Sequence, residues 1–300
     1  MRILVLAFAC CFPALAVAVD STGEAYAKLQ KLGIFALHKS KVPMTISWSY
    51  EVSEPAEAKS KETYKAIYAL DRFREEVIGR DGENKVVRKE AWSYDGAMYY
   101  WLDAQSGTLM VGSKRHAINN SKSPRGLYSL PFWGLGTSPL AASWPMTSVL
   151  DEKQIQTLLS GLILDVQADR VAVKPANQES PNDSISYSYL TKDQRLEGVE
   201  MRVVNKEGDG YIQTSTASEF KTITSGADKI CLPTVIDIVT ATTGKSDSGT
   251  IIMRARCSVS KYGLAKPEDL SSAFSLDPML AQTVYDVDSK VFLKGQPASK

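Results

Sequence analysis

The residues that could support catalysis are few in this chain. Only two histidines are present, His38 and His116, which leaves little material for an imidazole-based metal site or a Ser-His-Asp triad. No Gly-x-Ser-x-Gly, His-Glu-x-x-His or glycine-rich phosphate loop occurs. Asp286-x-Asp288 could contact calcium, but the remaining ligands and the glycine of a calcium loop are missing, so we interpret it as a solvated turn. The sequence therefore predicts no catalytic residue, no metal site and no cofactor.

The N-terminus has the pattern of an export signal. Met1-Arg2 is a short charged start, Ile3 to Ala18 is almost wholly apolar, and Ala16-Val17-Ala18 is the small-x-small pattern that a signal peptidase cleaves. The apolar run is about 16 residues long, whereas a membrane-spanning helix needs about 20. We therefore expect residues 1–18 to be a signal peptide and the remainder to be exported, with the periplasm as the favoured compartment. A retained anchor and lipid attachment to a leader cysteine are the alternatives.

Composition and charge describe an ordinary globular chain. Of the 300 residues, 44% are hydrophobic and 23% charged, which argues against disorder. Lys and Arg number 35 against 34 Asp and Glu; loss of Arg2 with the leader gives 34 − 34 = 0. A nucleic-acid partner needs a basic field, so none is expected. Residues 19–300 are expected to form a single domain.

Two cysteines, Cys231 and Cys257, remain after removal of the leader. They lie in a segment with the pattern of a hairpin, with strands at Lys229–Thr240 and Thr250–Ser260 around a turn-rich loop. Their midpoint, (231 + 257)/2 = 244, falls in or beside that loop. In an oxidising compartment this spacing predicts a cross-strand disulfide with Cα atoms within about 7 Å. Two free thiols are the alternative.

Most of the remaining chain has the alternation and turn signals of antiparallel β-structure. A helix is expected from the Ser21 capping box to Ala36, and another over Asp151–Ser160. With the cysteine hairpin, about ten or eleven strands are predicted, so the fold class is mainly β with a few helices (α+β). The other predicted strands are Met44–Val52, Tyr64–Ile78, Lys85–Tyr94, Ala97–Leu102, Thr108–Ser113, Leu162–Val173, Ser184–Leu190, Leu196–Asn205 and Tyr211–Ile223.

Asp95-Gly96 is the strongest short turn signal in the chain. It lies between two segments rich in aromatic residues, which predicts a tight type I′ hairpin. With a two-residue loop, partner numbers sum to 191, so Trp92 should face Tyr99 and Tyr94 should face Ala97.

The stretch Gly126–Leu150 contains no charged residue in 25 positions. Its prolines and glycines exclude a membrane-spanning helix. Such an apolar loop beside a sheet either completes the core or covers a cavity that holds a hydrophobic ligand. In the second case we expect four residues to line the cavity: Leu130, Phe132, Trp133 and Leu135.

Several short motifs in order resemble a known family. They are Asp71-Arg72-Phe73-Arg74-x-Glu76, then Glu90-x-Trp92-x-Tyr94-Asp95-Gly96-x-x-Tyr99-Tyr100, Leu232-Pro233, a basic late strand with Arg254 and Arg256, Phe274-x-Leu276-x-Pro278 and Val284-x-Asp286. In this succession the chain resembles the bacterial outer-membrane lipoprotein-carrier superfamily (LolA/LolB-like), especially its divergent planctomycete-type members, over roughly residues 24–290.

The resemblance implies a half-open antiparallel β-barrel whose mouth is closed by helices and loops over an apolar cavity. Family members bind lipid or lipoprotein acyl chains between the two bacterial membranes, which implies a hydrophobic ligand here and transient contact with membrane-associated transport machinery. Carriers of the family hold their closed state with an arginine on an early strand, and Arg72 is the nearest match. The alternative for Arg72 and Arg74 is an exposed charge paired with Glu75 or Glu76.

Three functions follow from these observations. The favoured one is an exported, non-catalytic carrier or binder of a hydrophobic ligand. The others are a secreted enzyme, such as a hydrolase that uses carboxylates, and a structural envelope protein with a filled core. An apolar cavity would favour the first, convergent acids with perturbed pKa values the second, and a fully packed interior the third.

Overall fold

The computed structural model describes residues 43–69, 72–113, 162–166, 170–175, 184–190, 195–205, 207–225, 228–244, 249–265, 270 and 273–295. The expected signal peptide, both expected helices and the charge-free stretch Gly126–Leu150 lie outside these residues.

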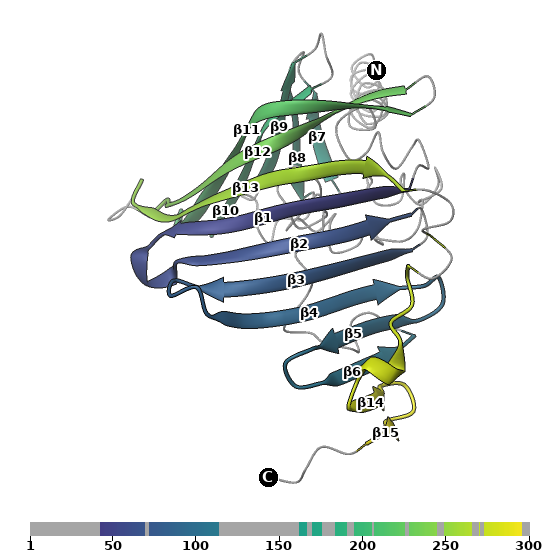
Figure 1. The fold of residues 1–300 in the computed structure, drawn as a ribbon. Coiled ribbons are helices and arrows are strands. Elements are labelled where there is room, and N and C mark those ends of the chain that lie inside the picture. The colour runs from purple at the N-terminus through teal and green to yellow at the C-terminus, as the bar shows by residue number, and fades with distance from the viewer. Residues whose placement is uncertain are drawn as a thin grey trace, which may run out of the picture.

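The described chain is almost entirely β-strand, arranged as two antiparallel meanders and a C-terminal pair (Figure 1). Two 3₁₀ turns, η1 (Ala56–Ala58) and η3 (Pro278–Leu280), are the helical elements of this part of the chain. The first meander contains β1 (Met44–Glu54), β2 (Ser60–Tyr68), β3 (Phe73–Asp81), β4 (Val86–Tyr94), β5 (Tyr99–Asp103) and β6 (Thr108–Gly112). The second contains β7 (Leu162–Val166), β8 (Arg170–Pro175), β9 (Ser184–Leu190), β10 (Arg195–Val204), β11 (Gly210–Ser225), β12 (Asp228–Thr242) and β13 (Ile251–Leu264). The C-terminal strands are β14 (Thr283–Asp286) and β15 (Val291–Lys294).

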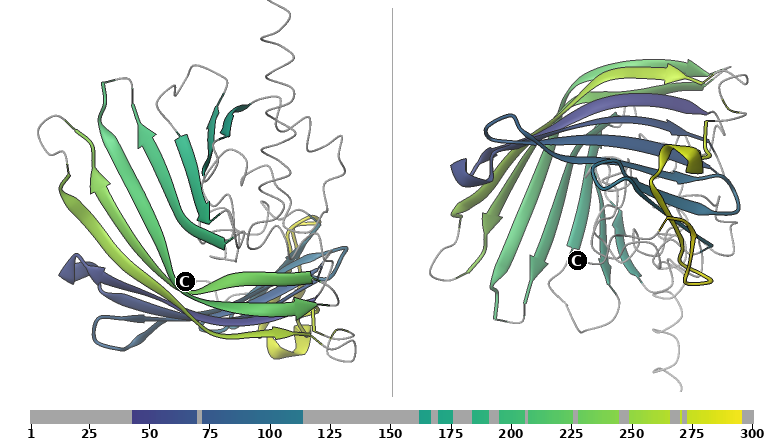
Figure 2. Two further views of the ribbon diagram at one scale, coloured as in Figure 1. Left: turned by 90° about the horizontal axis from the view of Figure 1, so that it is seen from above. Right: turned by 60° about the horizontal axis from the view of Figure 1, so that its bottom comes forward.

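All fifteen strands belong to one sheet, in the order β15-β14-β6-β5-β4-β3-β2-β1-β13-β12-β11-β10-β9-β8-β7. Pairing of β1 with β13 joins the two meanders, and β14 lies parallel to β6 whereas the other neighbours are antiparallel. The sheet is strongly curved, so that its two halves turn toward one another (Figure 2). Its edge strands β7 and β15 do not pair with each other, so the described strands form an open sheet and not a closed barrel.

The eleven predicted strands are all present, but four more are found. The predicted strand Tyr64–Ile78 is in fact β2 and β3, and Leu162–Val173 is β7 and β8. Neither internal turn contains Gly or Pro, the residues that signal most turns. At the first turn, the Ala69 amide donates to the Arg72 carbonyl at 2.8 Å. The other two additional strands are β14 and β15, so 11 + 2 + 2 gives the fifteen observed.

Strict alternation of burial along β1 defines two faces of the sheet. Met44, Ile46, Trp48 and Tyr50 are buried, while the intervening residues are partly or fully exposed. Because residues directly opposite across a ladder point to the same side, the register extends this assignment to neighbouring strands. We call the side that carries Trp48 the buried face. Its other members include Glu62, Tyr64, Ala66, Phe73, Glu75, Val77, Gly79, Arg88, Glu90, Trp92, Trp101, Ile236, Ile238, Ala255 and Cys257.

The Asp95-Gly96 turn is confirmed as a turn, but the predicted register is wrong. The residue numbers of two paired residues add up to 193 in this hairpin. Tyr94 therefore faces Tyr99, and the loop has four residues instead of two. Asp95 explains the longer loop, because its carboxylate accepts hydrogen bonds from the amides of Ala97 and Met98 at 2.9 and 2.8 Å. Partial burial alone would raise the pKa of Asp95, but these hydrogen bonds lower it below its ordinary value. Gly96 has a φ of +103°, which favours glycine.

The C-terminal segment forms a small second core on the opposite side of β4–β6. The Ser93 hydroxyl donates to the carbonyls of Phe73 and Phe274, which ties the segment to β3 and β4. Phe274 is itself buried. The Phe-x-Leu-x-Pro motif seen in the sequence therefore anchors the chain end to the sheet. The members of this core are Ala91, Leu109, Leu276, Ala281 and Val284.

Candidate ligand-binding face

Aromatic side chains extend across the buried face of the first meander. Trp48 on β1 stacks on Tyr64 of β2, with ring centroids 4.7 Å apart and an interplanar angle of 1°. Trp92 on β4 faces Trp101 on β5, with centroids 6.2 Å apart. Each large ring contributes roughly 150–250 Å² of apolar surface when buried. This part of the sheet therefore offers a broad aromatic surface on one side.

A charged cluster is embedded in this aromatic surface. The Arg88 guanidinium bridges two carboxylates, Glu62 at 3.0 Å and Glu90 at 3.1 Å. The Tyr64 hydroxyl donates to Glu62 at 2.5 Å, and the Trp101 indole donates to Glu90 at 3.2 Å. Each carboxylate therefore accepts hydrogen bonds from the guanidinium and from an aromatic donor.

Gly79 makes this arrangement possible. Arg88 on β4 and Glu62 on β2 are both directly opposite Gly79 on the intervening strand β3. A Cβ atom added to Gly79 would lie 3.0 Å from Arg88 Cβ and 3.6 Å from Glu62 Cγ. The missing side chain leaves room for the ion pair to form across one strand.

Burial shifts the proton affinities of this cluster. Burial, together with the charge and hydrogen bond of Glu62, raises the pKa of the Tyr64 hydroxyl above its ordinary value. Burial alone would lower the pKa of Arg88, but the hydrogen bond and charge of Glu90 and the charge of Glu62 raise it. The guanidinium is therefore a permanent cation between two carboxylates. Glu75, which is buried, is a further carboxyl group on this part of the face.

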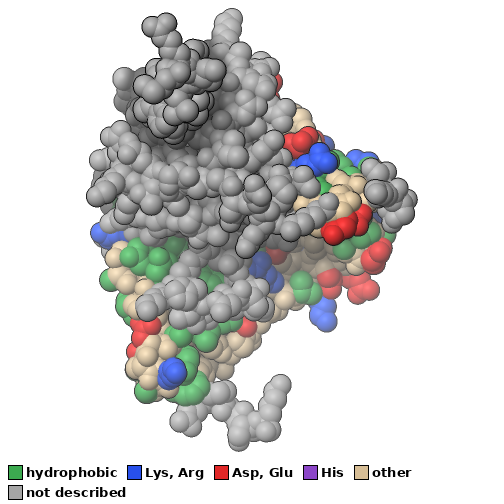
Figure 3. Space-filling view, turned by 180° about the vertical axis from the view of Figure 1, so that it is seen from behind, with side chains coloured by type: hydrophobic (Ala, Val, Ile, Leu, Met, Phe, Trp, Pro, Cys, Tyr) green, Lys and Arg blue, Asp and Glu red, His purple; other side chains and the backbone are tan. Residues whose placement is uncertain are grey.

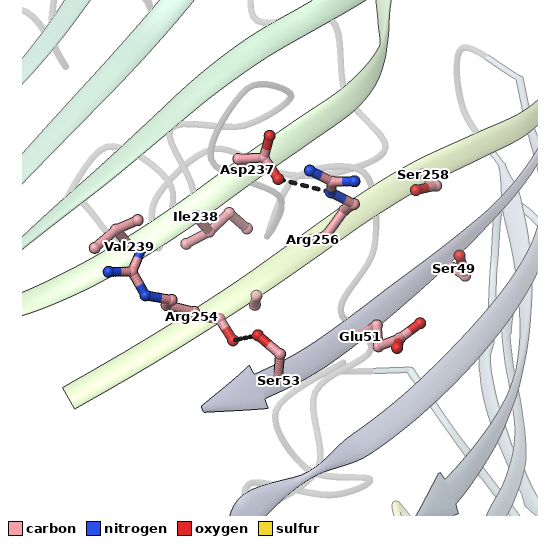
Figure 4. Close-up of a pocket in the computed structure, with 10 residues that line it drawn as sticks. Ser49, Glu51, Ser53, Asp237, Ile238, Val239, Arg254, Arg256 and Ser258 are labelled. Atoms are coloured by element: carbon pink, nitrogen blue, oxygen red, sulfur yellow. Dashed lines mark hydrogen bonds and ion pairs between the residues drawn. The ribbon is translucent and has the colours of Figure 1, made fainter. Parts of the chain in front are cut away.

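The opposite side of the sheet has a different character at β1, β12 and β13. An open depression of about 600 Å³ there is lined mostly by serine and charged residues, together with Val239 and with Ile238 and Ala255, whose side chains the register assigns to the buried face (Figure 4). Arg256 pairs with Asp237 at 2.7 Å, and Arg254 with Glu54 at 2.9 Å. These side chains are largely exposed, so water screens both pairs. We call this surface the polar depression.

The view from behind shows how the described surface is divided (Figure 3). Hydrophobic side chains gather over the lower part of this surface, and acidic and basic side chains both occur beside them.

The predicted cavity-lining residues Leu130, Phe132, Trp133 and Leu135 lie outside the described residues, so their role stays a prediction. Arg72 is exposed immediately before β3, and its Nε lies 3.7 Å from the position that a Cβ on Gly96 would occupy. It is not part of the buried face.

The expected exposed pairing is found for Arg74. Its guanidinium contacts the carboxylate of Glu76 at 2.7 Å, two residues further along the same side of β3. This pair is one of the alternatives that the sequence left open.

The predicted disulfide between Cys231 and Cys257 is wrong for this structure, in which both are free thiols. Cys257 lies opposite Ile236 on β12, five residues from Cys231. Five residues of strand span roughly 16 Å, well beyond the reach of a disulfide. The residue numbers of paired residues in this hairpin add up to 493. The centre of the hairpin is therefore at residues 246–247 and not at residue 244.

Asp286 and Asp288 form a turn, as expected from the sequence. Asp286 accepts from the amide of Asp288 at 2.9 Å, and Asp288 accepts from the amide of Ser113 at 2.6 Å. Hydrogen bonds from Ser289 and Asp288 lower the pKa of the Asp286 carboxyl. Across the part of the chain that the structure describes, no group of three or more His, Cys, Asp or Glu side chains could hold a metal ion.

Sequence reasoning missed the Arg88 cluster, although one signal was present. Glu90-x-Trp92-x-Tyr94 has the period of two that places alternate residues on one face of a strand. A charged residue in register with two aromatics indicates a carboxylate on an apolar face. No comparable signal connects Glu62 with Arg88, since their contact depends on strand register.

No helix within the described ranges has the length and apolar character required to cross a bilayer. Comparison with family models found no match, and comparison with curated proteins found none.

Comparison with solved structures returned matches with TM-scores below 0.5. A LolA superfamily protein, NE2245 from Nitrosomonas europaea, matches with a TM-score of 0.41 and 10% identity over 82% of this chain and 98% of its own. A domain described as outer membrane lipoprotein-sorting, from Vibrio parahaemolyticus, matches with a TM-score of 0.39 and 9% identity over 86% and 97%. The MucA/MucB complex of Pseudomonas aeruginosa contains a chain that matches with a TM-score of 0.28 and 9% identity over 80% and 93%.

Proposed function

We propose that this chain is a non-catalytic carrier or binder of a hydrophobic ligand, such as a lipid or a lipoprotein acyl chain, in the bacterial envelope. The observation that carries this proposal is the aromatic buried face of β1–β5. In the described part of the chain, β1–β5 are consecutive strands of one sheet. A broad apolar surface on a single curved sheet suits an elongated apolar ligand.

The energetics set a demanding condition for such a carrier. Each methylene removed from water gains about 0.8 kcal/mol, so a 16-carbon chain gains roughly 12 kcal/mol. A bilayer offers the same gain, so a carrier must nearly match it and still release the ligand. Stacked rings such as Trp48 on Tyr64 provide apolar contact of this kind without a covalent bond. Trp48, Tyr64 and Trp92 are at most 2% exposed, so ligand binding at this face would include a rearrangement of the chain.

The proposal extends to the sequence-predicted residues. Leu130, Phe132, Trp133 and Leu135 would supply the movable wall of the site, and Arg72 would act at its margin. Transient contact with membrane-associated transport machinery would deliver and remove the ligand, and export through residues 1–18 would bring the chain to the periplasm.

The test is lipid binding by the full mature chain. Organic extracts of the purified protein are analysed by mass spectrometry, and binding of a fluorescent fatty acid methyl ester is titrated. We expect co-purified lipid and saturable binding, with affinity lowered at least tenfold by Trp133→Ala. Phe292→Ala is the matched control, since Phe292 contacts Tyr285 at the edge hairpin, away from the buried face.

The outcomes separate the functions. Absence of both co-purified lipid and probe binding would overturn the carrier proposal and favour a structural protein with a filled core. Equal effects of Trp133→Ala and Phe292→Ala would remove the charge-free loop from the site.

A further inference from the structure

Two indole N–H groups on the buried face have no acceptor. Trp48 is 2% exposed and Trp92 is 1% exposed, and neither Nε1 atom has a hydrogen-bond partner among the described residues. Trp101 provides the contrast, because its Nε1 donates to Glu90 at 3.2 Å. More than nine-tenths of buried polar groups are paired in folded proteins, so two unpaired donors on one face call for an explanation.

The positions of the two donors make them part of the candidate site. Trp48 lies on β1 and Trp92 on β4, separated by β2 and β3, and both side chains are on the buried face. At about 4.8 Å per strand, three strand steps place the donors roughly 14 Å apart across the sheet. They therefore offer two separate polar contacts on a surface that is aromatic apart from the Arg88 cluster, in which the Nε atom of Arg88 likewise has no acceptor among the described residues.

The charges of the same face select the kind of acceptor. Among the described residues of this cluster, the two carboxylates of Glu62 and Glu90 already neutralise the guanidinium of Arg88, and Glu75 is a further buried carboxyl group. A carboxylate or phosphate brought to this face would meet excess negative charge at low effective dielectric. An uncharged carbonyl oxygen accepts a hydrogen bond from an indole without that penalty.

We propose that Trp48 and Trp92 are hydrogen-bond donors to the carbonyl oxygens of a neutral acyl ester or amide, which identifies the ligand class of the buried face. This inference rests on the proposed function, since it names the chemistry of the ligand that the carrier would hold. A ligand carbonyl completes a hydrogen bond that the unliganded face leaves unmade, so acyl esters are bound in preference to hydrocarbon chains that lack the carbonyl.

The experiment compares two lipids that differ in one carbonyl group. Binding of 1-palmitoylglycerol and of 1-O-hexadecylglycerol to the full mature chain is measured by displacement of the fluorescent methyl ester. We expect the ester to bind about tenfold more tightly than the ether, and palmitate, which is anionic, to bind more weakly than the ester. In the double variant Trp48→Phe, Trp92→Phe, which keeps the aromatic rings and removes the N–H groups, the ester-to-ether ratio should fall toward one.

Trp101→Phe is the matched control, because its N–H is already paired with Glu90. It should leave the ester-to-ether ratio unchanged, whatever it does to the affinity for both lipids. Equal binding of ester and ether by the wild-type chain overturns the inference while the carrier function stands, and this readout needs no variant. A ratio that survives in the double variant also overturns it. If neither lipid binds, the proposed function and the inference fail together.

Discussion

Two arginine clusters on opposite sides of the sheet have similar geometry and different surroundings. On the buried face, Arg88 lies 3.0 Å from Glu62 and 3.1 Å from Glu90, and its side chain is 18% exposed. At the polar depression, Arg254 lies 2.9 Å from Glu54, and its side chain is 45% exposed. Judged by these distances alone, the two clusters would contribute equally to stability.

The two clusters differ in how a charged side chain is solvated once its ion-pair partner has been removed. At the polar depression, water solvates any charge that loses its partner, so exposed pairs contribute little to stability. On the buried face, a carboxylate that loses Arg88 remains among aromatic rings with little access to water. The same interaction is therefore replaceable on one side of the sheet and required on the other. The buried cluster contributes charged groups to the candidate site, whereas the exposed pairs lie on the opposite side of the sheet.

Removal of Arg88 should have the largest effect. Arg88→Met leaves the buried Glu90 and the largely buried Glu62, with side chains 3% and 16% exposed, without their cation. Loss of one partner of a buried ion pair typically costs about 3–5 kcal/mol of unfolding free energy. Arg254→Met, the matched change at the polar depression, should cost no more than about 0.5 kcal/mol. Urea unfolding followed by far-UV circular dichroism measures both.

A rescue variant sharpens this comparison. Adding Glu62→Gln and Glu90→Gln to Arg88→Met removes the stranded charges and should recover part of the lost stability. No recovery in this triple variant, or equal costs for Arg88→Met and Arg254→Met, would contradict the role given to burial.

The two cysteines provide the next largest contrast. Burial raises the pKa of the Cys257 thiol to about 12, and the side chain lies on the buried face, whereas Cys231 is partly exposed. At pH 8 we expect iodoacetamide to modify Cys231 at least 100-fold faster than Cys257, a difference of about 2.8 kcal/mol. Peptide mass spectrometry identifies the modified residue, and urea should abolish the difference.

The sign of the pH effect follows from the same shift. Because the folded-state pKa of Cys257 is above its ordinary value, its contribution to stability is complete below about pH 9 and is lost as the pH rises toward about 12. Comparable labelling of both thiols in the folded chain, or a disulfide resistant to modification, would show that the register of β12 and β13 differs from that described.

Gly79→Ala should have an intermediate effect. The added Cβ would lie 3.0 Å from Arg88 Cβ, so the side chain that reaches Glu62 must shift, and overpacking of this kind costs about 1–3 kcal/mol. Gly82→Ala is the control, because its Cβ would meet Lys59 Cβ at an ordinary 3.4 Å. Thermal unfolding compares the two, and equal melting temperatures would show that the gap at Gly79 is not needed.

These residues also show how far sequence reasoning reaches. Alternation and turn residues located all eleven predicted strands, because the period of two is a local property. Turns without Gly or Pro, such as Ala69–Arg72, have no such signal. The sequence therefore predicted one strand where the structure has β2 and β3, and one where it has β7 and β8. Register is not local, which is why the partners of Tyr94 and of Cys257 were wrongly assigned.

The candidate site was predictable only in part for the same reason. The sequence predicted an aromatic ligand surface in the loop at Trp133, which stays a prediction, and it did not indicate the aromatic pairs at Trp48 and Trp92 on the sheet. The ion pair between Glu62 and Arg88 depends on two registers and on a glycine between them. No pattern along the chain contains that information.

Salt should produce the smallest effect and separate the two clusters most directly. The Debye length falls from about 10 Å at 0.1 M salt to about 3 Å at 1 M, so exposed charges are screened while buried pairs are screened much less. The small stability difference between wild type and Arg254→Met, at most about 0.5 kcal/mol, should vanish in 1 M NaCl, because water and ions already surround the Arg254–Glu54 pair. The cost of Arg88→Met should persist, since its carboxylate partner Glu90 has a side chain only 3% exposed.

Urea midpoints for the three proteins at both salt concentrations make the test, with sodium sulfate avoided because it strengthens apolar burial by itself. If 1 M NaCl reduced the Arg88→Met cost in proportion to that of Arg254→Met, the buried cluster would be open to solvent. The contrast between the two sides of the sheet would then be one of degree.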